Sequence, residues 1–166
     1  MLLVLLLLVR HALAAARDGS RYPDDSLRPL EPRGRKAQAR VSRRLREAGI
    51  IPSAIFSSPW KRAWQTAGIL AEELGLGKTA RVACPFLAGE PDLDAIGGAI
   101  GQRGEEEIVA LVGHEPWMGE LASLLLTGSP TRLGIPFPKS GVMAIRIGAI
   151  APAGGQLEFF TSPKLP

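Results

Sequence analysis

An unbroken apolar run near the start of the chain constrains the fold most. Residues 2–9 read LLVLLLLV, and Arg10 and His11 follow at once. A strand with helices packed on both of its faces is apolar along its whole length. The run is too short for a membrane span, which needs about 20 residues, and it lacks the basic segment and small-residue cleavage site of a signal peptide. We therefore expect a buried parallel strand that ends at two polar residues.

Helices and strands are predicted to alternate along the rest of the chain. Apolar positions at helical spacing, bounded by proline at the start and glycine at the end, predict helices over residues 32–48, 60–74 and from 116 onwards, with a less regular one after Asp92. Short apolar runs predict strands over residues 54–57, 81–84, 108–113, 142–147 and 157–160. This alternation indicates an α/β fold, a three-layer α/β/α sandwich around a mostly parallel sheet.

Length and composition favour a single domain. The chain has 166 residues, of which 46% are hydrophobic and 22% charged, as in ordinary globular proteins. We recognise no interdomain linker or internal repeat. We therefore expect one domain over residues 1–166.

Polar residues follow the predicted strands at the points where those strands end. They are Arg10 and His11 after the first strand, Ser57, Ser58 and Arg62 after the second, Glu90 after the third, and Gly113 and His114 after the fourth. In open parallel sheets, ligands bind beyond the carboxyl ends of the strands. Both histidines of the chain and two arginines are thus predicted to meet at one edge of the sheet.

This set of side chains suits a phosphoryl group. Guanidinium groups, an imidazole and helix N-termini attract a dianion. A neutral His11 can attack phosphorus and hold the phosphoryl group covalently until water removes it, while Arg10, Arg62 and His114 stabilise the charge on its oxygens. We expect no cofactor and no metal, because no carboxylates cluster around either histidine.

Four motifs in order resemble those of a known family. Residues 8–12 (LVRHA) carry the first arginine and histidine, residues 57–67 (SSPWKRAWQTA) the second arginine, and residues 112–116 (VGHEP) the second histidine. The segment LRPL at residues 27–30, with Gly34, lies between the first two motifs. Together they resemble the histidine phosphatase superfamily, and the short chain resembles its SixA-like phosphohistidine phosphatase branch.

The resemblance implies a phosphoglycerate-mutase-like fold and a phosphohistidine intermediate on His11. It also implies a phosphohistidine on a protein of a phosphorelay as the substrate and inorganic phosphate as the product. Relatives place a proton donor near Glu90, with Asp92 as a rival. In a histidine-to-histidine transfer, the imidazole that gives up the phosphoryl group and the imidazole that accepts it have nearly the same chemistry. Such a transfer therefore needs less protonation of the leaving group than hydrolysis of an ester does.

Three alternatives remain open from the sequence. The chain could hydrolyse small phosphate monoesters, or bind phosphate without turnover. It could also bind nucleic acid through its basic run, which comprises Arg33, Arg35, Lys36, Arg40, Arg43, Arg44 and Arg46. Because no aromatic residues are interleaved with this run, we interpret it as a solvated helix face. We expect no nucleic-acid partner and no membrane partner.

Several residues near the motifs have structural interpretations. Cys84, the single cysteine, lacks the arginine that a cysteine-dependent phosphatase needs six positions later, where Glu90 stands. We expect it to be a buried strand residue in a protein of the reducing cytoplasm. Ser57 and Ser58 are expected to cap the following helix, and Glu115 is expected to favour a helix N-terminus through the helix dipole.

Overall fold

The computed structural model describes residues 3–101 and 107–164, and its centre is a mixed sheet of six strands in the order β3-β2-β4-β1-β5-β6. The strands are β1 (Val4–Arg10), β2 (Ala54–Ser57), β3 (Arg81–Ala83), β4 (Ile108–Gly113), β5 (Val142–Ile147) and β6 (Gly155–Thr161). Strands β1, β4, β2 and β3 pair in parallel, whereas β5 pairs antiparallel with both β1 and β6. The prediction of a mostly parallel sheet is confirmed.

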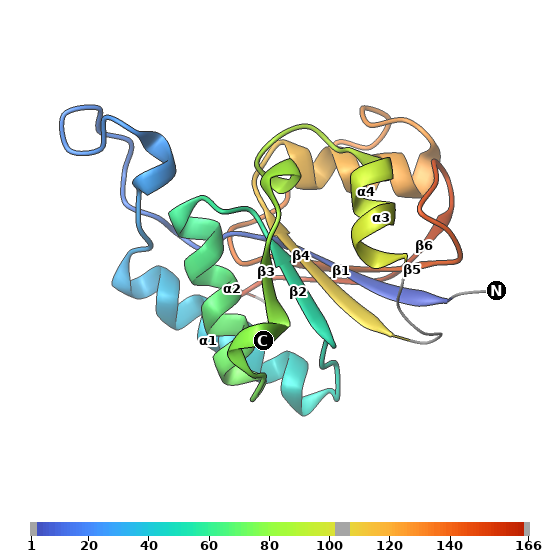
Figure 1. Ribbon diagram of the computed structural model, residues 1–166, viewed down its shortest axis with the longest axis horizontal. Helices are drawn as coiled ribbons and strands as arrows, with labels where there is room; N and C mark the ends of the chain where they lie inside the picture. Colours follow the sequence, from blue (N-terminus) through green and yellow to red (C-terminus); the bar gives the residue numbers. More distant parts are fainter. Residues whose placement is uncertain (1–2, 102–106, 165–166) are drawn as a thin grey trace.

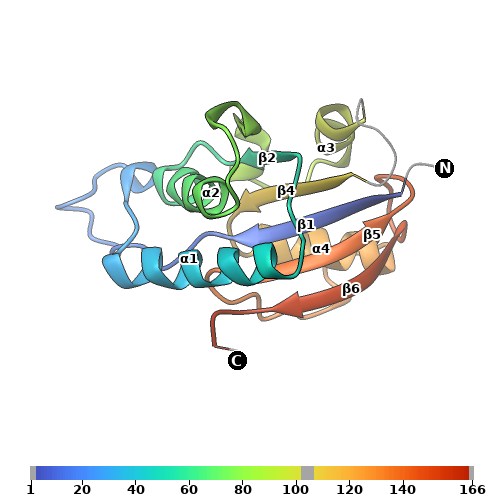
Figure 2. The same ribbon diagram turned by 90° about the horizontal axis from the view of Figure 1, so that it is seen from below.

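Helices cover both faces of this sheet. They are α1 (Pro32–Glu47), α2 (Lys61–Glu73), α3 (Leu93–Ile100) and α4 (Trp117–Thr127), with short 3-10 turns η1 (Asp25–Leu27), η2 (Lys78–Ala80) and η3 (Pro85–Ala88). Helices α1 and α2 lie on one face, and α3 and α4 lie on the other (Figures 1 and 2). The three-layer α/β/α prediction is confirmed.

Strand β1 shows why its sequence is apolar throughout. Leu6 and Leu8 pack into the core on the side of α3 and α4, whereas Leu7 and Val9 pack into the core on the side of α1 and α2. All four side chains are fully buried. A polar residue at any of these positions would lose its hydration without gaining a partner. The predicted start of the strand at residue 2 lies outside the described residues.

The sheet order brings three strand ends together. In the register of the parallel pairs, Arg10 lies opposite Gly113, and Ser57 lies opposite Val112. The chain therefore leaves β1, β4 and β2 at one edge of the sheet, on three neighbouring strands. His11, His114 and Ser58 are the first residues after these strands.

Some predicted boundaries need correction by a residue or two. Arg10 is the last residue of β1 rather than the first residue after it, whereas Ser57 and Gly113 end β2 and β4 at the predicted bounds. Cys84 is buried as expected, but it precedes η3 instead of belonging to β3. The helix predicted over residues 32–48 ends at Glu47, and Ala48, which follows it, is exposed. Among the described residues, no helix is long and apolar enough to cross a membrane.

Candidate active site

His11 lies at the end of β1 with a defined tautomer. Its ring Nδ1 lies 2.7 Å from the carbonyl oxygen of Ala12. A carbonyl oxygen can only accept a hydrogen bond, so Nδ1 carries the proton of the ring. Nε2 is therefore unprotonated and carries a lone pair. The Nε–H of Arg62 donates to that Nε2 over 3.3 Å. The nitrogen able to attack phosphorus therefore faces an arginine.

Burial keeps the His11 ring neutral. The side chain is almost fully enclosed, and burial lowers its pKa to about 3. The hydrogen bond to Ala12 opposes this shift, and the charges of Arg62 and Arg10 add to it. At neutral pH, Nε2 is unprotonated and available as a nucleophile.

Arg62, in the first turn of α2, is held by Asp25. Its Nη1 donates to the backbone oxygen of Asp25 over 2.8 Å, and its Nη2 pairs with the Asp25 carboxylate at 3.1 Å. The guanidinium carbon also lies 4.7 Å from the centre of the Trp60 ring. The Arg62 side chain is 4% exposed. These contacts orient the Arg62 guanidinium beside His11.

Asp25 is a member of the site that sequence reasoning missed. Its carboxylate also accepts from the Nε of Arg28 at 3.0 Å and lies 3.6 Å from the Nε of Arg17. Burial alone would raise the pKa of Asp25, but the Arg28 bond and the arginine charges outweigh it and lower that pKa. Asp25 is thus ionised at neutral pH and positions Arg62 rather than donating a proton.

His114 lies against His11 and is bound by Ser58. The two imidazole centres are 5.2 Å apart, and His114 Nε2 lies 2.8 Å from the hydroxyl of Ser58. Since that hydroxyl accepts from the backbone N–H of Trp60, its proton can be donated to Nε2. This leaves the proton of His114 on Nδ1, which is buried and has no hydrogen-bond partner among the described residues. Ser58 therefore orients His114 instead of capping α2, which has no side-chain cap.

Arg10 is the second cation of the cluster, after Arg62. Its Nη1 donates to the carbonyl oxygen of Phe137 over 2.7 Å, in the segment before β5. Burial lowers the pKa of Arg10, and the charge of Glu115 opposes that shift. A guanidinium remains protonated in proteins. The structure thus brings His11, Arg10, Arg62 and His114 together at one edge of the sheet.

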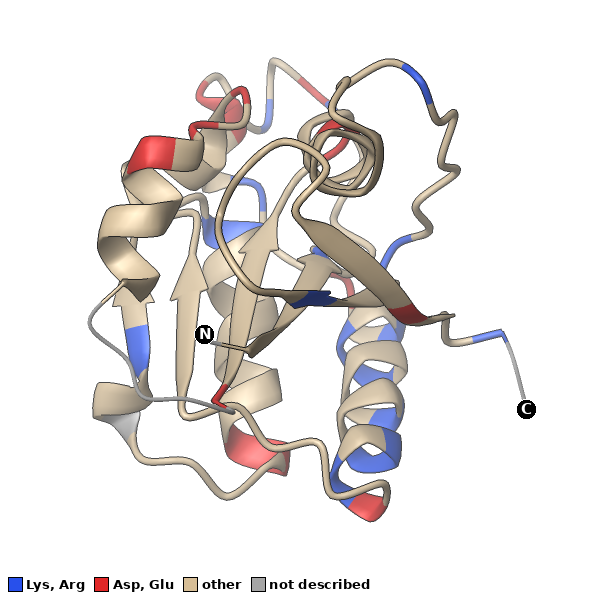
Figure 3. Cartoon of the chain, turned by 90° about the vertical axis from the view of Figure 1, so that its right-hand side faces the viewer, with Lys and Arg blue, Asp and Glu red and all other residues tan. Residues whose placement is uncertain are grey.

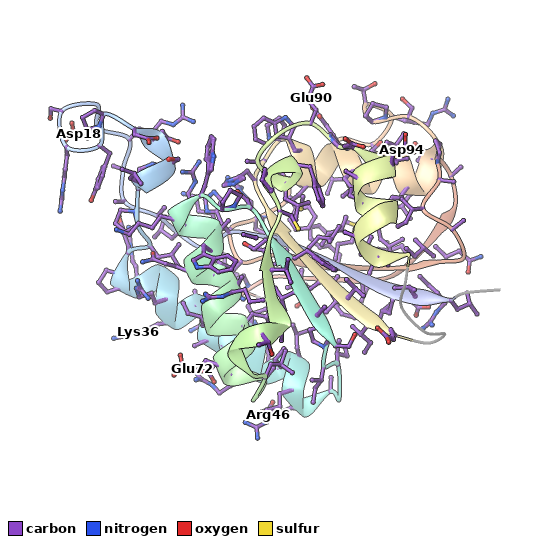
Figure 4. All side chains as sticks on the ribbon, viewed as in Figure 1. Asp18, Lys36, Arg46, Glu72, Glu90 and Asp94 are labelled. Atoms are coloured by element: carbon purple, nitrogen blue, oxygen red, sulfur yellow. The ribbon has the colours of Figure 1, made fainter. Side chains whose placement is uncertain are left out.

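Glu90 and Asp92 do not join this cluster. Glu90 is exposed, and Figure 4 shows it on the loop before α3, pointing away from the body of the molecule. Asp92 caps α3, because its carboxylate accepts from the backbone N–H of Ala95 over 2.9 Å. Neither carboxylate contacts the histidines in this conformation.

Glu115 interacts with the N-terminus of α4 as expected, because its carboxyl accepts from the backbone N–H of Gly119 in the first turn of that helix. Its carboxyl is half-buried, and Oε1 has no hydrogen-bond partner in the described part of the chain. Burial raises the pKa of Glu115 to about 7, although the nearby charge of Arg10 works against the shift. A carboxyl that is half protonated at neutral pH has the pKa of a proton donor.

The loop after β1 is held by two unusual contacts. The N–H of Ala12 donates to Thr66 Oγ1 over 3.0 Å, and that hydroxyl donates to the carbonyl oxygen of Arg62 over 2.7 Å. Helix α1 approaches this loop so closely that a Cβ at Gly34 would collide with the carbonyl oxygen of Leu13. The motif residues Thr66 and Gly34 therefore support the positions of His11 and Arg62.

Folding should become less favourable as the pH falls from about 6.5 to about 4.5. Unfolded histidines bind protons below about pH 6.5, whereas burial keeps the pKa values of His11 and His114 at about 3 in the folded chain. Each imidazole then costs roughly 1 kcal/mol of stability per pH unit. Glu115 acts in the opposite sense, because its pKa is about 7 when folded and 4.5 ordinarily.

Two variants should change this dependence in opposite directions. His114→Gln should flatten the loss of unfolding free energy between about pH 6.5 and 4.5, and Glu115→Gln should steepen it. Urea denaturation at three pH values in this window measures both slopes. Slopes equal to that of the parent protein in both variants would contradict the assigned protonation states.

Comparisons with known proteins agree with this geometry. The model of the histidine phosphatase superfamily (branch 1) matches residues 6–82. An uncharacterised protein of Picosynechococcus sp. (strain ATCC 27264 / PCC 7002 / PR-6) is 32% identical over 163 residues, covering 93% of this chain and 94% of the relative. The chain belongs to the histidine phosphatase superfamily.

Solved structures show the same fold. The protein histidine phosphatase SixA complexed with tungstate has a TM-score of 0.78 at 21% identity, covering 96% of this chain and 97% of that chain. A protein assigned as SixA from Agrobacterium tumefaciens has a TM-score of 0.74 at 23% identity, with coverages of 96% and 97%. Phosphoglycerate mutase from Plasmodium falciparum has a TM-score of 0.64 at 16% identity, with coverages of 100% and 96%. The fold is phosphoglycerate-mutase-like, as the resemblance implied.

Proposed function

We propose that this chain is a phosphatase that removes phosphate from phosphohistidine on a protein, through a covalent intermediate on His11. The observation that carries the proposal is the state of the His11 ring. Its Nδ1 proton is directed to the Ala12 carbonyl, and its unprotonated Nε2 accepts a hydrogen bond from the guanidinium of Arg62. Two further cationic or donor groups, Arg10 and His114, lie at the same edge of the sheet.

The first step transfers the phosphoryl group to the enzyme. The Nε2 lone pair forms a bond to phosphorus, and the bond from phosphorus to the leaving nitrogen breaks with its electron pair going to that nitrogen. Positive charge that develops on the His11 ring is stabilised by the Nδ1–H bond to Ala12. Arg62, Arg10 and the Nδ1–H of His114 stabilise the phosphoryl oxygens.

The second step releases phosphate. A water oxygen forms a bond to phosphorus, and the bond between phosphorus and Nε2 breaks, which returns the lone pair to His11. The water proton passes to the carboxylate of Glu115, and inorganic phosphate leaves. Glu115 gave its own proton to the leaving nitrogen in the first step, and its pKa of about 7 suits both roles. Burial lowers the pKa of His11 to about 3, and this favours the second step, because a weakly basic imidazole is a good leaving group.

Phosphohistidine suits this site better than an alkyl ester does. Transfer between two imidazoles nearly balances donor and acceptor, whereas an alkoxide leaves only with strong protonation. Among the described residues, no carboxyl group is hydrogen-bonded to the His11 ring, and Asp25 is held ionised by its arginines. Two solved neighbours, at 21% and 23% identity, carry the names SixA protein histidine phosphatase and SixA phosphohistidine phosphatase.

Parallel assays of two substrate classes test the proposal. A histidine-phosphorylated protein and small phosphate monoesters are incubated with the enzyme, and phosphate release is followed for each. We expect kcat/KM to be at least tenfold higher for the phosphoprotein. Higher values for the monoesters would assign the chain to small-molecule phosphatases, and phosphate binding without release would make it a binding module.

The proton donor can be identified from leaving-group effects. Glu90, the candidate from the sequence, is exposed, whereas Glu115 is half-buried with a pKa of about 7. The variant that lacks the donor should slow hydrolysis of an alkyl phosphate more than that of an aryl phosphate, because poorer leaving groups gain more from protonation. We expect this pattern in Glu115→Gln and an unchanged ratio in Glu90→Gln. The reverse pattern would restore Glu90 to the role.

A further inference from the structure

A basic groove leads away from the candidate active site. It has a volume of about 510 Å³ and lies between α1, the turn before β5 and the segment after β6. Arg33 and Arg40 line it from α1, Lys139 and Ser140 from the turn, and Lys164 from the C-terminal segment. Arg10 also lines it and is the neighbour of His11 in the chain. The groove is thus connected to the phosphoryl site through a shared arginine.

The charge of this groove is strongly one-sided. Arg10, Arg33, Arg40, Lys139 and Lys164 contribute five cations, and none of the described lining residues is acidic. Arg33 pairs with Glu31 at 3.1 Å, but that contact is exposed to solvent, and such pairs are weak. Like charges lining one concave surface focus the potential and attract anions.

Ser140 provides an independent sign of a binding site. Its side chain is 1% exposed, and its hydroxyl has no hydrogen-bond partner within the described residues. Its backbone N–H donates to the carbonyl oxygen of Arg10 over 3.2 Å. A buried hydroxyl without a partner is costly, and a ligand oxygen in the groove that Ser140 lines would supply the missing bond.

The structure also changes the interpretation of the basic run on α1. Figure 3 shows Lys and Arg along the length of this helix. Arg43 pairs with Glu73 at 3.1 Å, while Arg40 and Arg44 donate to the carbonyl oxygens of Pro163 and Ser162. Part of the run therefore lines the groove or holds the C-terminal segment, Arg43 pairs with α2, and Arg35 and Lys36 are exposed outside the groove. The run is not simply a solvated face.

We propose that the basic groove binds carboxylates of the phosphoprotein substrate, so that an acidic segment of the partner docks beside its phosphohistidine. This inference rests on the proposed function. The groove is larger than a single phosphate needs, and one of its lining residues, Arg10, also belongs to the phosphoryl site. No aromatic side chain lines it among the described residues, so it lacks the stacking surfaces that favour single-stranded nucleic acid.

Synthetic peptides test the groove directly. One fluorescent peptide carries four aspartates and the other carries four serines in their place, both without phosphate, so that binding is measured independently of turnover. At low salt we expect the acidic peptide to bind at least tenfold tighter. The triple variant Arg33→Ala/Lys139→Ala/Lys164→Ala should weaken its binding about tenfold, as three surface charge contacts predict. Arg35→Ala/Lys36→Ala, exposed basic residues of α1 that do not line the groove, should leave it unchanged.

The same peptides with a phosphohistidine separate the two proposals. In the parent enzyme, kcat/KM should be higher for the acidic phosphopeptide, and the triple variant should remove most of that advantage. Hydrolysis of neither phosphopeptide would contradict the proposed function, while the binding data would still decide the groove. Equal binding of the acidic and neutral peptides would overturn the groove proposal. So would an oligonucleotide or inorganic phosphate that binds tighter than the acidic peptide and loses its binding in the triple variant.

Discussion

His11→Ala is expected to lower phosphate release from a histidine-phosphorylated protein to the uncatalysed background. The reason is that Nε2 of His11 is unprotonated, because the proton of the ring is on Nδ1 and is donated to Ala12, and that this Nε2 faces Arg62. The other imidazole, His114, has its Nε2 bound to Ser58. Steady-state phosphate release, with circular dichroism to show that the variant is folded, measures the effect.

His114→Ala provides the matched comparison. It removes a neighbouring imidazole of similar burial, 2% against 7% exposed, but leaves the nucleophile in place. We expect slower turnover with the phosphoenzyme still formed, whereas His11→Ala should form none. Substantial turnover in His11→Ala would rule out its role as the nucleophile.

Arg62→Ala is expected to lower kcat about 100- to 1,000-fold, as the loss of one preorganised oxyanion donor does. The guanidinium contacts His11 Nε2 and is fixed by two contacts to Asp25, so it is already oriented before a phosphoryl group arrives. Arg62→Lys should restore only part of the rate, because an ammonium cannot provide a bidentate fork. Arg10→Ala should show a loss of the same order.

Arg43→Ala is the control for removing an arginine from an ion pair. Arg43 and Glu73 are 3.1 Å apart, the same distance as Arg62 and Asp25, but the Arg43 side chain is 54% exposed against 4% for Arg62. We expect Arg43→Ala to keep the parent kcat. Asp25→Asn should give a loss smaller than Arg62→Ala, since the backbone bond from Arg62 to Asp25 remains. Parent kinetics in Arg62→Ala would place the phosphoryl group elsewhere.

The fold was largely predictable from apolar periodicity. Strands β2 and β4 have the predicted bounds, because buried strands demand unbroken apolar runs and polar residues end them. Helix α1 starts at Pro32 as predicted and ends one residue early. The strand order and the antiparallel β5 could not be read from the sequence, because pairing depends on contacts between residues far apart in the chain.

The site was predictable where its residues follow strands. Arg10, His11, Arg62 and His114 meet as the rule for parallel sheets predicts. Asp25 was missed because it lies in an irregular polar stretch and pairs with an arginine 37 positions away. Asp25 lies two residues before the LRPL segment, which resembles a motif of the family. This position was the one signal in the sequence that could have placed Asp25 near the site. The half-buried state of Glu115 depends on tertiary packing, which no local pattern reports.

Chemical trapping of the phosphoenzyme tests the central claim most directly. The enzyme is mixed with a protein labelled with radioactive phosphate on histidine, quenched within milliseconds in base, and digested for peptide mapping. The account predicts a label that is stable in base and lost in acid, on the peptide containing His11, and absent from His11→Ala. Phosphate release without any enzyme-bound label, or a label on another residue, would contradict it.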